Sequence, residues 1–196
     1  IYASSSSVYG GNAKVPFAET DPVEQPVSVY AATKRSTELL ASCYHHLYGL
    51  PTVGLRYFTV YGPWGRPDMA YMTFTRSILA GQPIDVYNEG KMERDFTYID
   101  DIVSGTIAAL RSKVSGEIIN LGNHRPVTLD AFIGTIEKAL GKKAERRLKP
   151  MPAGDVLKTY ADITKAKALL GWQPTTTLEQ GIPKFVEWYQ SYYRNS

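Results

Sequence analysis

The sequence predicts an α/β fold built on a parallel sheet. Residues 1–3 have the pattern of the end of a buried strand, and residues 51–57 form a second β-rich run. Between them, residues 28–48 have the apolar spacing of a helix. A strand, a helix and a second strand in this order indicate parallel strands joined by a crossover helix. Ligands of such a sheet bind beyond the carboxyl ends of its strands, where the serine run 4–7 and residues 58–63 would meet.

The helix predicted over residues 28–48 has recognisable ends. Ser28 is a suitable N-cap, and Gly49 follows the last apolar residues as a C-terminal cap does. We expect Cys43, in the middle of this helix, to be a buried structural thiol. The apolar positions form a stripe that a sheet or a partner helix has to cover: Leu39, Leu40, Cys43, Leu47 and Tyr48.

The rest of the chain alternates short strands with further helices. Thr128 is a suitable cap for a helix that Gly141 ends, and Asp100 or Asp101 can open a helix that runs to about Arg111. Strands are expected over residues 84–87, 94–98 and 117–121, and the other helices over residues 71–80, 162–170 and 178–193.

Composition excludes several classes of protein. The 196 residues include 22 basic and 19 acidic side chains, a mixture too even to indicate a nucleic acid or an anionic membrane surface as partner. No apolar run is long enough to span a bilayer. The single cysteine excludes an internal disulfide and favours a reducing, cytoplasmic location. The three histidines lack the spacing of metal ligands, so no metal site is predicted.

The beginning of the chain is unusual. No methionine or leader precedes Ile1, and we expect the chain to be a piece of a longer protein. The 16 glycines are scattered, and no G-x-G-x-x-G sequence follows a predicted strand. The sequence therefore contains no recognisable loop for the diphosphate of a dinucleotide.

Tyr30 and Lys34 carry the first chemical signal. They are four residues apart, so a helix places the phenol and the ammonium one turn apart on the same face. A neighbouring lysine cation favours the phenolate form of a tyrosine, which can then take a proton from a hydroxyl group. A serine can hold the same hydroxyl while a nicotinamide cofactor accepts the hydride. On the pair alone, a surface tyrosine stacked along a lysine stem is the alternative.

Longer motifs resemble a known family. Residues 4–10, the Tyr30-x-x-x-Lys34 pair and residues 55–63 together resemble the extended short-chain dehydrogenases/reductases, the NAD-dependent epimerases and dehydratases of nucleotide sugars. Within that family, YFTVYGPWGRPDMA at 57–70 and RDFTYIDD at 94–101 are similar to UDP-glucuronate 4-epimerases. The resemblance implies NAD as cofactor, a UDP-sugar as substrate, and a homodimer formed through the Tyr30 helix.

The resemblance also implies a fold and a division of the chain. The fold is the C-terminal portion of a doubly wound parallel (Rossmann-type) sheet plus a small α/β substrate-binding lobe. Residues 1–62 are the nucleotide-binding part with the Tyr30 helix, 63–94 a segment of the substrate lobe, 95–122 a return to the nucleotide-binding part, and 123–196 the substrate lobe.

Specific roles follow from the resemblance alone. Tyr30 matches the catalytic base, Lys34 the lysine that also holds the nicotinamide ribose, and Ser5 the hydroxyl that contacts the sugar. Thr59 stands where a hydroxyl suits a sugar carboxylate. The remaining matches are Ser6 and Ser7 beside the sugar, Tyr57 and Phe58 along the nicotinamide, Arg66 at uracil or ribose, Val86 and Tyr87 on the substrate, Arg94 at the diphosphate and Asp155 at a ribose hydroxyl.

Two alternatives stay open. Dehydratases and decarboxylases of the family usually carry an acid just before Val-Tyr-Gly, where this chain has Ser6 and Ser7, so elimination is disfavoured. The second alternative is a fragment that binds a nucleotide sugar or another protein without catalysis. Because no NAD loop is recognisable, we expect the 196 residues alone to be inactive.

Overall fold

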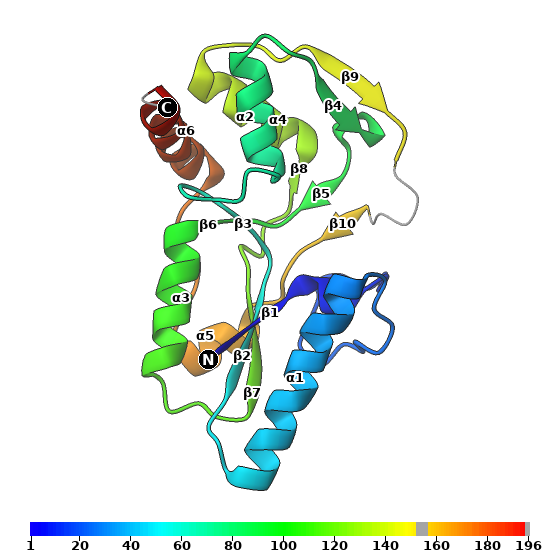
Figure 1. Cartoon of the computed structure of the whole chain (residues 1–196), viewed down its shortest axis with the longest axis vertical. Coiled ribbons are helices and arrows are strands. Elements are labelled where there is room, and N and C mark those ends of the chain that lie inside the picture. Colours follow the sequence, from blue (N-terminus) through cyan, green and yellow to red (C-terminus); the bar gives the residue numbers. More distant parts are fainter. Residues whose placement is uncertain (152–156, 195–196) are drawn as a thin grey trace.

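The centre of the molecule is a three-stranded parallel sheet. The computed structural model describes residues 1–151 and 157–194. Within them, β1 (Tyr2–Ser5), β2 (Val53–Tyr57) and β7 (Glu117–Leu121) pair in the order β1-β2-β7, all in one direction (Figure 1). Their carboxyl ends therefore meet at one edge. This confirms the predicted α/β fold with a parallel sheet.

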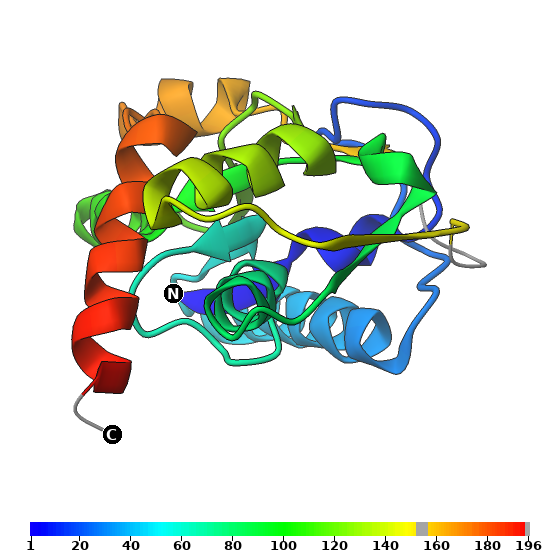
Figure 2. The same cartoon turned by 90° about the horizontal axis from the view of Figure 1, so that it is seen from above.

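Helices cover both faces of this sheet. Helix α1 (Val29–Tyr48) lies on one side of the strands, and α3 (Ile99–Arg111) and α5 (Thr164–Leu170) lie on the other (Figures 1 and 2). The face toward α3 and α5 is apolar, because Leu55 and Ile119 occupy neighbouring register positions and are fully buried there. The sheet core also contains Val8, Tyr9, Phe17, Val53, Phe58, Ile102, Leu121, Ala161, Ile163, Ala166 and Trp172.

The second part of the molecule is a smaller lobe with its own core. It contains α2 (Ala70–Leu79), β4 (Ile84–Tyr87), α4 (Leu129–Leu140), β9 (Arg146–Lys149) and α6 (Leu178–Arg194). Strands β4 and β9 pair in parallel, and α4 packs against both α2 and α6. The core residues include Tyr61, Tyr71, Met72, Ile78, Ile84, Val86, Phe96, Phe132, Ile133, Ile136, Ile182, Phe185 and Tyr189.

Short strands connect the two parts. β3 (Thr59–Tyr61) pairs with β6 (Phe96–Tyr98), while β5 (Glu93–Arg94) lies between β8 (Val127–Thr128) and β10 (Lys158–Thr159). The single strand predicted over residues 94–98 is thus two strands with different partners.

The break between those two strands is caused by Asp95. Its side chain is 1% exposed and accepts hydrogen bonds from the backbone N–H groups of Asn123, His124 and Ala161, and from the Thr97 hydroxyl. Burial raises the pKa of Asp95 to about 6, although these hydrogen bonds act in the opposite direction. The carboxylate ties three chain segments together at the junction of the two parts.

The prediction for Cys43 is wrong. Helix α1 begins after Ser28 and ends before Gly49 as expected, but Cys43 is exposed. The apolar stripe around it is also uncovered within the chain, because α1 turns a different face to the sheet. Four of its side chains are 51–72% exposed: Leu39, Leu40, Leu47 and Tyr48.

The predicted domain boundaries stay a prediction, although the two cores described above are separate. Helix α5 and Trp172 pack in the sheet core, not in the core of the smaller lobe. In the described part of the chain, the structure shows no helix that is long and apolar enough to cross a membrane.

Candidate active site

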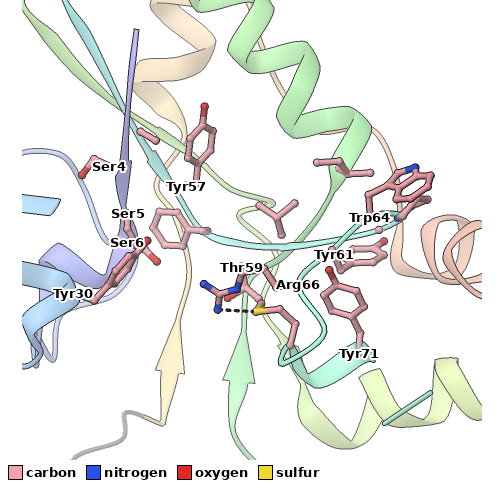
Figure 3. Close-up of a pocket in the computed structure, with 18 of the residues that line it drawn as sticks. Ser4, Ser5, Ser6, Tyr30, Tyr57, Thr59, Tyr61, Trp64, Arg66 and Tyr71 are labelled. Carbon is pink, nitrogen blue, oxygen red and sulfur yellow. Dashed lines mark hydrogen bonds between the residues drawn. The ribbon is translucent and has the colours of Figure 1, made fainter. Parts of the chain in front are cut away.

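A cavity of about 520 Å³ opens at the carboxyl ends of β1 and β2. Ser5, Ser6 and Tyr30 lie close together on one side of it, and Thr59 and Arg66 lie toward its middle (Figure 3). The other side is aromatic, with Tyr61, Trp64 and Tyr71. The serine run, helix α1 and the segment that follows β2 thus meet at the carboxyl edge of the sheet. This is the edge where the sequence predicted a shared site.

Tyr30 and Lys34 lie at the open side of this cavity. Ser28 accepts a hydrogen bond from the Ala31 amide and fixes the first turn of α1, in which Tyr30 stands. The Tyr30 side chain is 51% exposed, and Lys34 Nζ lies 5.7 Å from the centre of its ring. Lys34 Nζ also donates to the Ala3 carbonyl at 3.0 Å, which holds the ammonium against β1.

The serine run changes direction at Ser5. Ser5 ends β1 and caps a short 3₁₀ helix (Ser6–Tyr9), and its Oγ accepts from the Ser7 amide at 3.2 Å and the Ser7 hydroxyl at 3.0 Å. Because Ser5 Oγ accepts both bonds, its own hydroxyl proton remains available for a ligand. Ser6 lines the cavity, whereas Ser7 supports Ser5 from behind.

The last residue of β2 and the two residues that follow it form the floor of the cavity. The Tyr57 hydroxyl lies 3.0 Å from Thr106 Oγ1, and the Phe58 amide donates to the Leu121 carbonyl. Phe58 is buried, so it gives this segment a rigid apolar support. Thr59 comes next and lines this cavity together with a second one.

The second cavity, of about 420 Å³, lies between the smaller lobe and the short connecting strands β3, β5 and β6. Thr59, Tyr87 and Arg94 line it, with Asp68, Ala70, Thr73, Phe74, Asp85, Met92, Phe96 and Leu129. Arg94 Nη1 donates to the Glu93 carbonyl at 3.0 Å. Two of the predicted substrate residues, Tyr87 and Arg94, are therefore brought together, and Thr59 joins their cavity to that of Tyr30.

A family model describes residues 1–122 as belonging to the NAD dependent epimerase/dehydratase family. The chain belongs to this family. Residues 1–122 include Tyr30, Lys34, the serine run, Thr59 and Arg94, so both cavities contain residues of the matched region.

Relatives in this epimerase/dehydratase family are close in sequence. An uncharacterized protein of Methanocaldococcus jannaschii is 57% identical over 96% of this chain and 58% of its own length. UDP-glucuronate 4-epimerase 1 of Arabidopsis thaliana is 52% identical over 98% of this chain and 49% of its own length. The chain thus spans about half to three fifths of these curated relatives.

Solved structures of the family share the fold. The UDP-glucuronic acid 4-epimerase of Bacillus cereus, in complex with UDP-glucuronic acid and NAD, is 39% identical with a TM-score of 0.90. The match covers 97% of this chain and 61% of that one. It confirms the predicted Rossmann-type α/β architecture.

Of the predicted site residues, Ser7 and Val86 line neither of the two cavities. Arg66 lines the first cavity together with Ser5 and Tyr30, not the second, and its exposed side chain pairs with Asp68 at 3.0 Å. Val86 is 1% exposed and packs in the core of the smaller lobe, and its contact with the substrate stays a prediction. Asp155 lies outside the described residues.

Sequence reasoning missed two features of the site. Trp64 is 73% exposed at the cavity rim and contacts Trp188 and Tyr192. Glu38 and Arg56, directly behind the cavity, are buried and paired. A signal for Glu38 was available, because it follows Tyr30 and Lys34 at the same four-residue spacing.

Proposed function

We propose that the protein interconverts UDP-glucuronate and UDP-galacturonate by inverting C4 of the sugar. The observation that carries the proposal is the meeting of Tyr30, Lys34 and Ser5 at one cavity, which Thr59 joins to a second cavity. The first cavity suits a reacting sugar, and the second suits the nucleotide that anchors it. The names of the relatives support the same reaction.

The proton chemistry falls to the residues of the first cavity. Tyr30 takes the proton of the sugar 4-hydroxyl, and the Lys34 ammonium lies 5.7 Å from the centre of its ring. Ser5 donates its free hydroxyl proton to the same sugar oxygen, which positions C4. Tyr30 returns the proton after the 4-keto sugar has turned its other face.

NAD would supply the acceptor for the C4 hydride and the donor for its return, so the cofactor would be retained and not consumed. The donor set fits its nicotinamide end: the Lys34 ammonium and Tyr30 phenol reach an open cavity whose floor is Tyr57 and Phe58. No glycine-rich diphosphate loop occurs in the 196 residues. We therefore propose that this chain alone is inactive and that activity needs the additional length found in its relatives.

The UDP part is assigned to the second cavity. Arg94 supplies a cation for the diphosphate there, and Tyr87 provides an exposed aromatic ring for the base or ribose. Thr59, at the border of the two cavities, is placed to hold the sugar carboxylate. That hold matters because a 4-keto uronic acid loses carbon dioxide unless its carboxylate is kept out of alignment.

The test is turnover of UDP-glucuronate by the complete polypeptide that contains this chain, with NAD, product chromatography and NADH absorbance. We expect UDP-galacturonate and no lasting NADH. Tyr30→Phe should lower kcat at least about 100-fold, because the general base is lost. Tyr44→Phe is the matched control, since Tyr44 is an exposed tyrosine of the same helix that does not line the cavity, and it should retain activity.

Other products would contradict the proposal in defined ways. A UDP-pentose with carbon dioxide would make the protein a decarboxylase and would remove the role given to Thr59. If calorimetry shows UDP binding but no turnover is detected, the protein binds nucleotide sugars without catalysis. Turnover by the 196-residue chain itself would show that the expected inactivity is wrong.

A further inference from the structure

A polar row crosses the face of the sheet that lies under α1. Ser4, Arg56 and Asn120 occupy neighbouring register positions on β1, β2 and β7, and they are 2%, 1% and 0% exposed. Side chains at the same register position of parallel strands point to the same face. A row of three buried polar residues replaces the apolar row that this face of a covered sheet normally carries.

Glu38 of α1 lies against this row and accepts hydrogen bonds from two of its members. Its carboxylate accepts from Ser4 Oγ at 2.5 Å and, through both oxygens, from Arg56 Nε at 2.8 Å and Nη2 at 2.9 Å. Burial acts to raise the pKa of Glu38, but hydrogen bonds from Arg56 and Ser4 outweigh it and hold the pKa below its ordinary value. The pair is therefore charged and fixed in a two-pronged geometry.

Arg56 is connected to β7 through Tyr9. Its guanidinium lies 4.8 Å from the centre of the Tyr9 ring, and the Tyr9 hydroxyl donates to Asn120 Oδ1 at 2.7 Å. Asn120 Nδ2 in turn donates to the carbonyls of Phe17 and Asp162. One connected network thus joins α1 to all three strands and to the loop before α1.

This network is a buried polar attachment of α1 to the sheet. Among the residues of α1, only Ala31 and Glu38 are buried. Tyr30, Lys34 and Glu38 follow one another at four-residue spacing, so all three lie on the face that Glu38 fixes. A helix normally docks through an apolar stripe that tolerates sliding, whereas a two-pronged ion pair defines one position.

The same network borders the reacting groups. Ser4 itself lines the cavity, and so do Ser5, which directly follows it on β1, and Tyr57, which directly follows Arg56 on β2. A shift of α1 along the sheet would move Tyr30 and Lys34 relative to Ser5.

We propose that the Glu38–Arg56 pair positions Tyr30 and Lys34 against Ser5, and that this is its role in the reaction. The inference rests on the proposed function. A purely stabilising role is the competing explanation, but apolar replacement of a buried ion pair is often neutral or stabilising. A positioning role predicts a different result. Removing the two-pronged contact between Glu38 and Arg56 then displaces Tyr30 and Lys34 even if the protein remains folded.

The test compares three variants of the complete polypeptide: Glu38→Gln, Arg56→Lys, and the double variant Glu38→Leu with Arg56→Met. We expect kcat to fall by about 10- to 100-fold while KM stays within about 3-fold, since misplacement by about 1 Å has effects of this size. Glu137→Gln is the matched control, because Glu137 is a buried carboxylate on α4 that pairs with Arg146 at 3.1 Å in the smaller lobe. Its kcat should be unchanged.

The double variant separates the two explanations. If it melts near the wild-type temperature and has a lowered kcat, the pair positions the catalytic residues. If it melts there and keeps the wild-type kcat, the proposal is overturned. Should the double variant fail to fold, Arg56→Lys decides, because it keeps the charge and removes only the two-pronged contact; an unchanged kcat in this variant overturns the proposal as well.

A spectroscopic measurement keeps the inference independent of turnover. The ring signal of Tyr30 in ¹³C-tyrosine-labelled protein can be assigned by its absence in Tyr30→Phe. We expect it to shift in Arg56→Lys and in Glu38→Gln, and to stay in place in Glu137→Gln. A wild-type protein without turnover would contradict the proposed function only, whereas an unmoved Tyr30 signal in both variants would contradict the positioning role.

Discussion

Helices α1 and α4 have the same signals at their ends but opposite relations to the protein core. α4 turns apolar side chains inward and buries Phe132, Ile133 and Ile136 completely. Helix α1 turns the carboxylate of Glu38 inward and buries only Ala31 and Glu38. The side chains of its apolar stripe are exposed. The comparison shows that an apolar stripe identifies a helix, but not that the stripe is the face turned toward the core of the same chain.

The two helices therefore rely on different interactions. α4 is held by the hydrophobic effect and by shape, since Phe132 stacks on Phe96 with ring centres 3.9 Å apart. α1 is held by the charged fork of Glu38 and Arg56. We expect the first kind of contact to stabilise the fold and the second to define the place of α1, which carries Tyr30 and Lys34.

The largest effect on stability is expected in α4. Phe132→Ala should lower the free energy of unfolding by about 4 kcal/mol, because it removes a fully buried ring and leaves a cavity. Leu40→Ala on the outer face of α1 is the control and should change the stability by less than about 0.5 kcal/mol. Urea unfolding followed by circular dichroism measures both. Equal losses would mean that the α1 stripe is already covered in solution.

The next effect is expected at the buried ion pair. Glu38→Gln should cost about 3 kcal/mol at neutral pH, because it leaves the Arg56 charge buried without its counter-charge. The folded state lowers the pKa of Glu38, so its contribution is present above about pH 4.5 and is lost as the pH falls through the lowered value. The difference in stability between wild type and variant should therefore shrink as the pH falls through the lowered pKa of Glu38. A difference that stays constant as the pH falls would contradict the assignment.

Much of the candidate site could be predicted from the sequence because it depends on local geometry. Four-residue spacing places Tyr30 and Lys34 on one face, and Ser28 fixes the turn that carries them. Strand alternation also separates Val86 from Tyr87: neighbours on a strand point to opposite faces, so only Tyr87 reaches the cavity. That distinction was available from the sequence and was missed.

Other features depend on contacts between distant segments. The break at Asp95 follows from hydrogen bonds to Asn123, His124 and Ala161, which no local pattern reveals. The exposure of Cys43 follows from the Glu38–Arg56 pair, whose members are 18 residues apart. The spacing of apolar residues identified the apolar face of α1 correctly. The Glu38–Arg56 pair, however, determines which face of the helix lies against the sheet.

The helix caps allow a finer comparison. Ser28 accepts from the Ala31 amide at 3.1 Å, and Thr128 accepts from the Ala131 amide at 3.2 Å. Removing either hydroxyl, in Ser28→Ala or Thr128→Ala, should cost about 1 kcal/mol. Packing holds the first turn of α4, so only Ser28→Ala should also speed amide hydrogen exchange in the turn of Tyr30. Faster exchange in both first turns would show that packing does not distinguish the two helices.

The smallest effect on stability, and the sharpest test of the comparison, concerns the outer face of α1. We propose that this face pairs with a second copy of the chain, because Leu40 and Leu47 are 62% and 66% exposed on a helix that is otherwise well formed. Leu40→Lys with Leu47→Lys should change the free energy of monomer unfolding by no more than about 0.5 kcal/mol and should abolish self-association in light scattering. Lysines on α3, in Val103→Lys with Ile107→Lys, are the control for exposed apolar residues of another helix, and they should leave association intact. Association that survives the α1 substitutions but not those on α3 would place the interface on the opposite face of the sheet, and the outward stripe of α1 would then need a different partner.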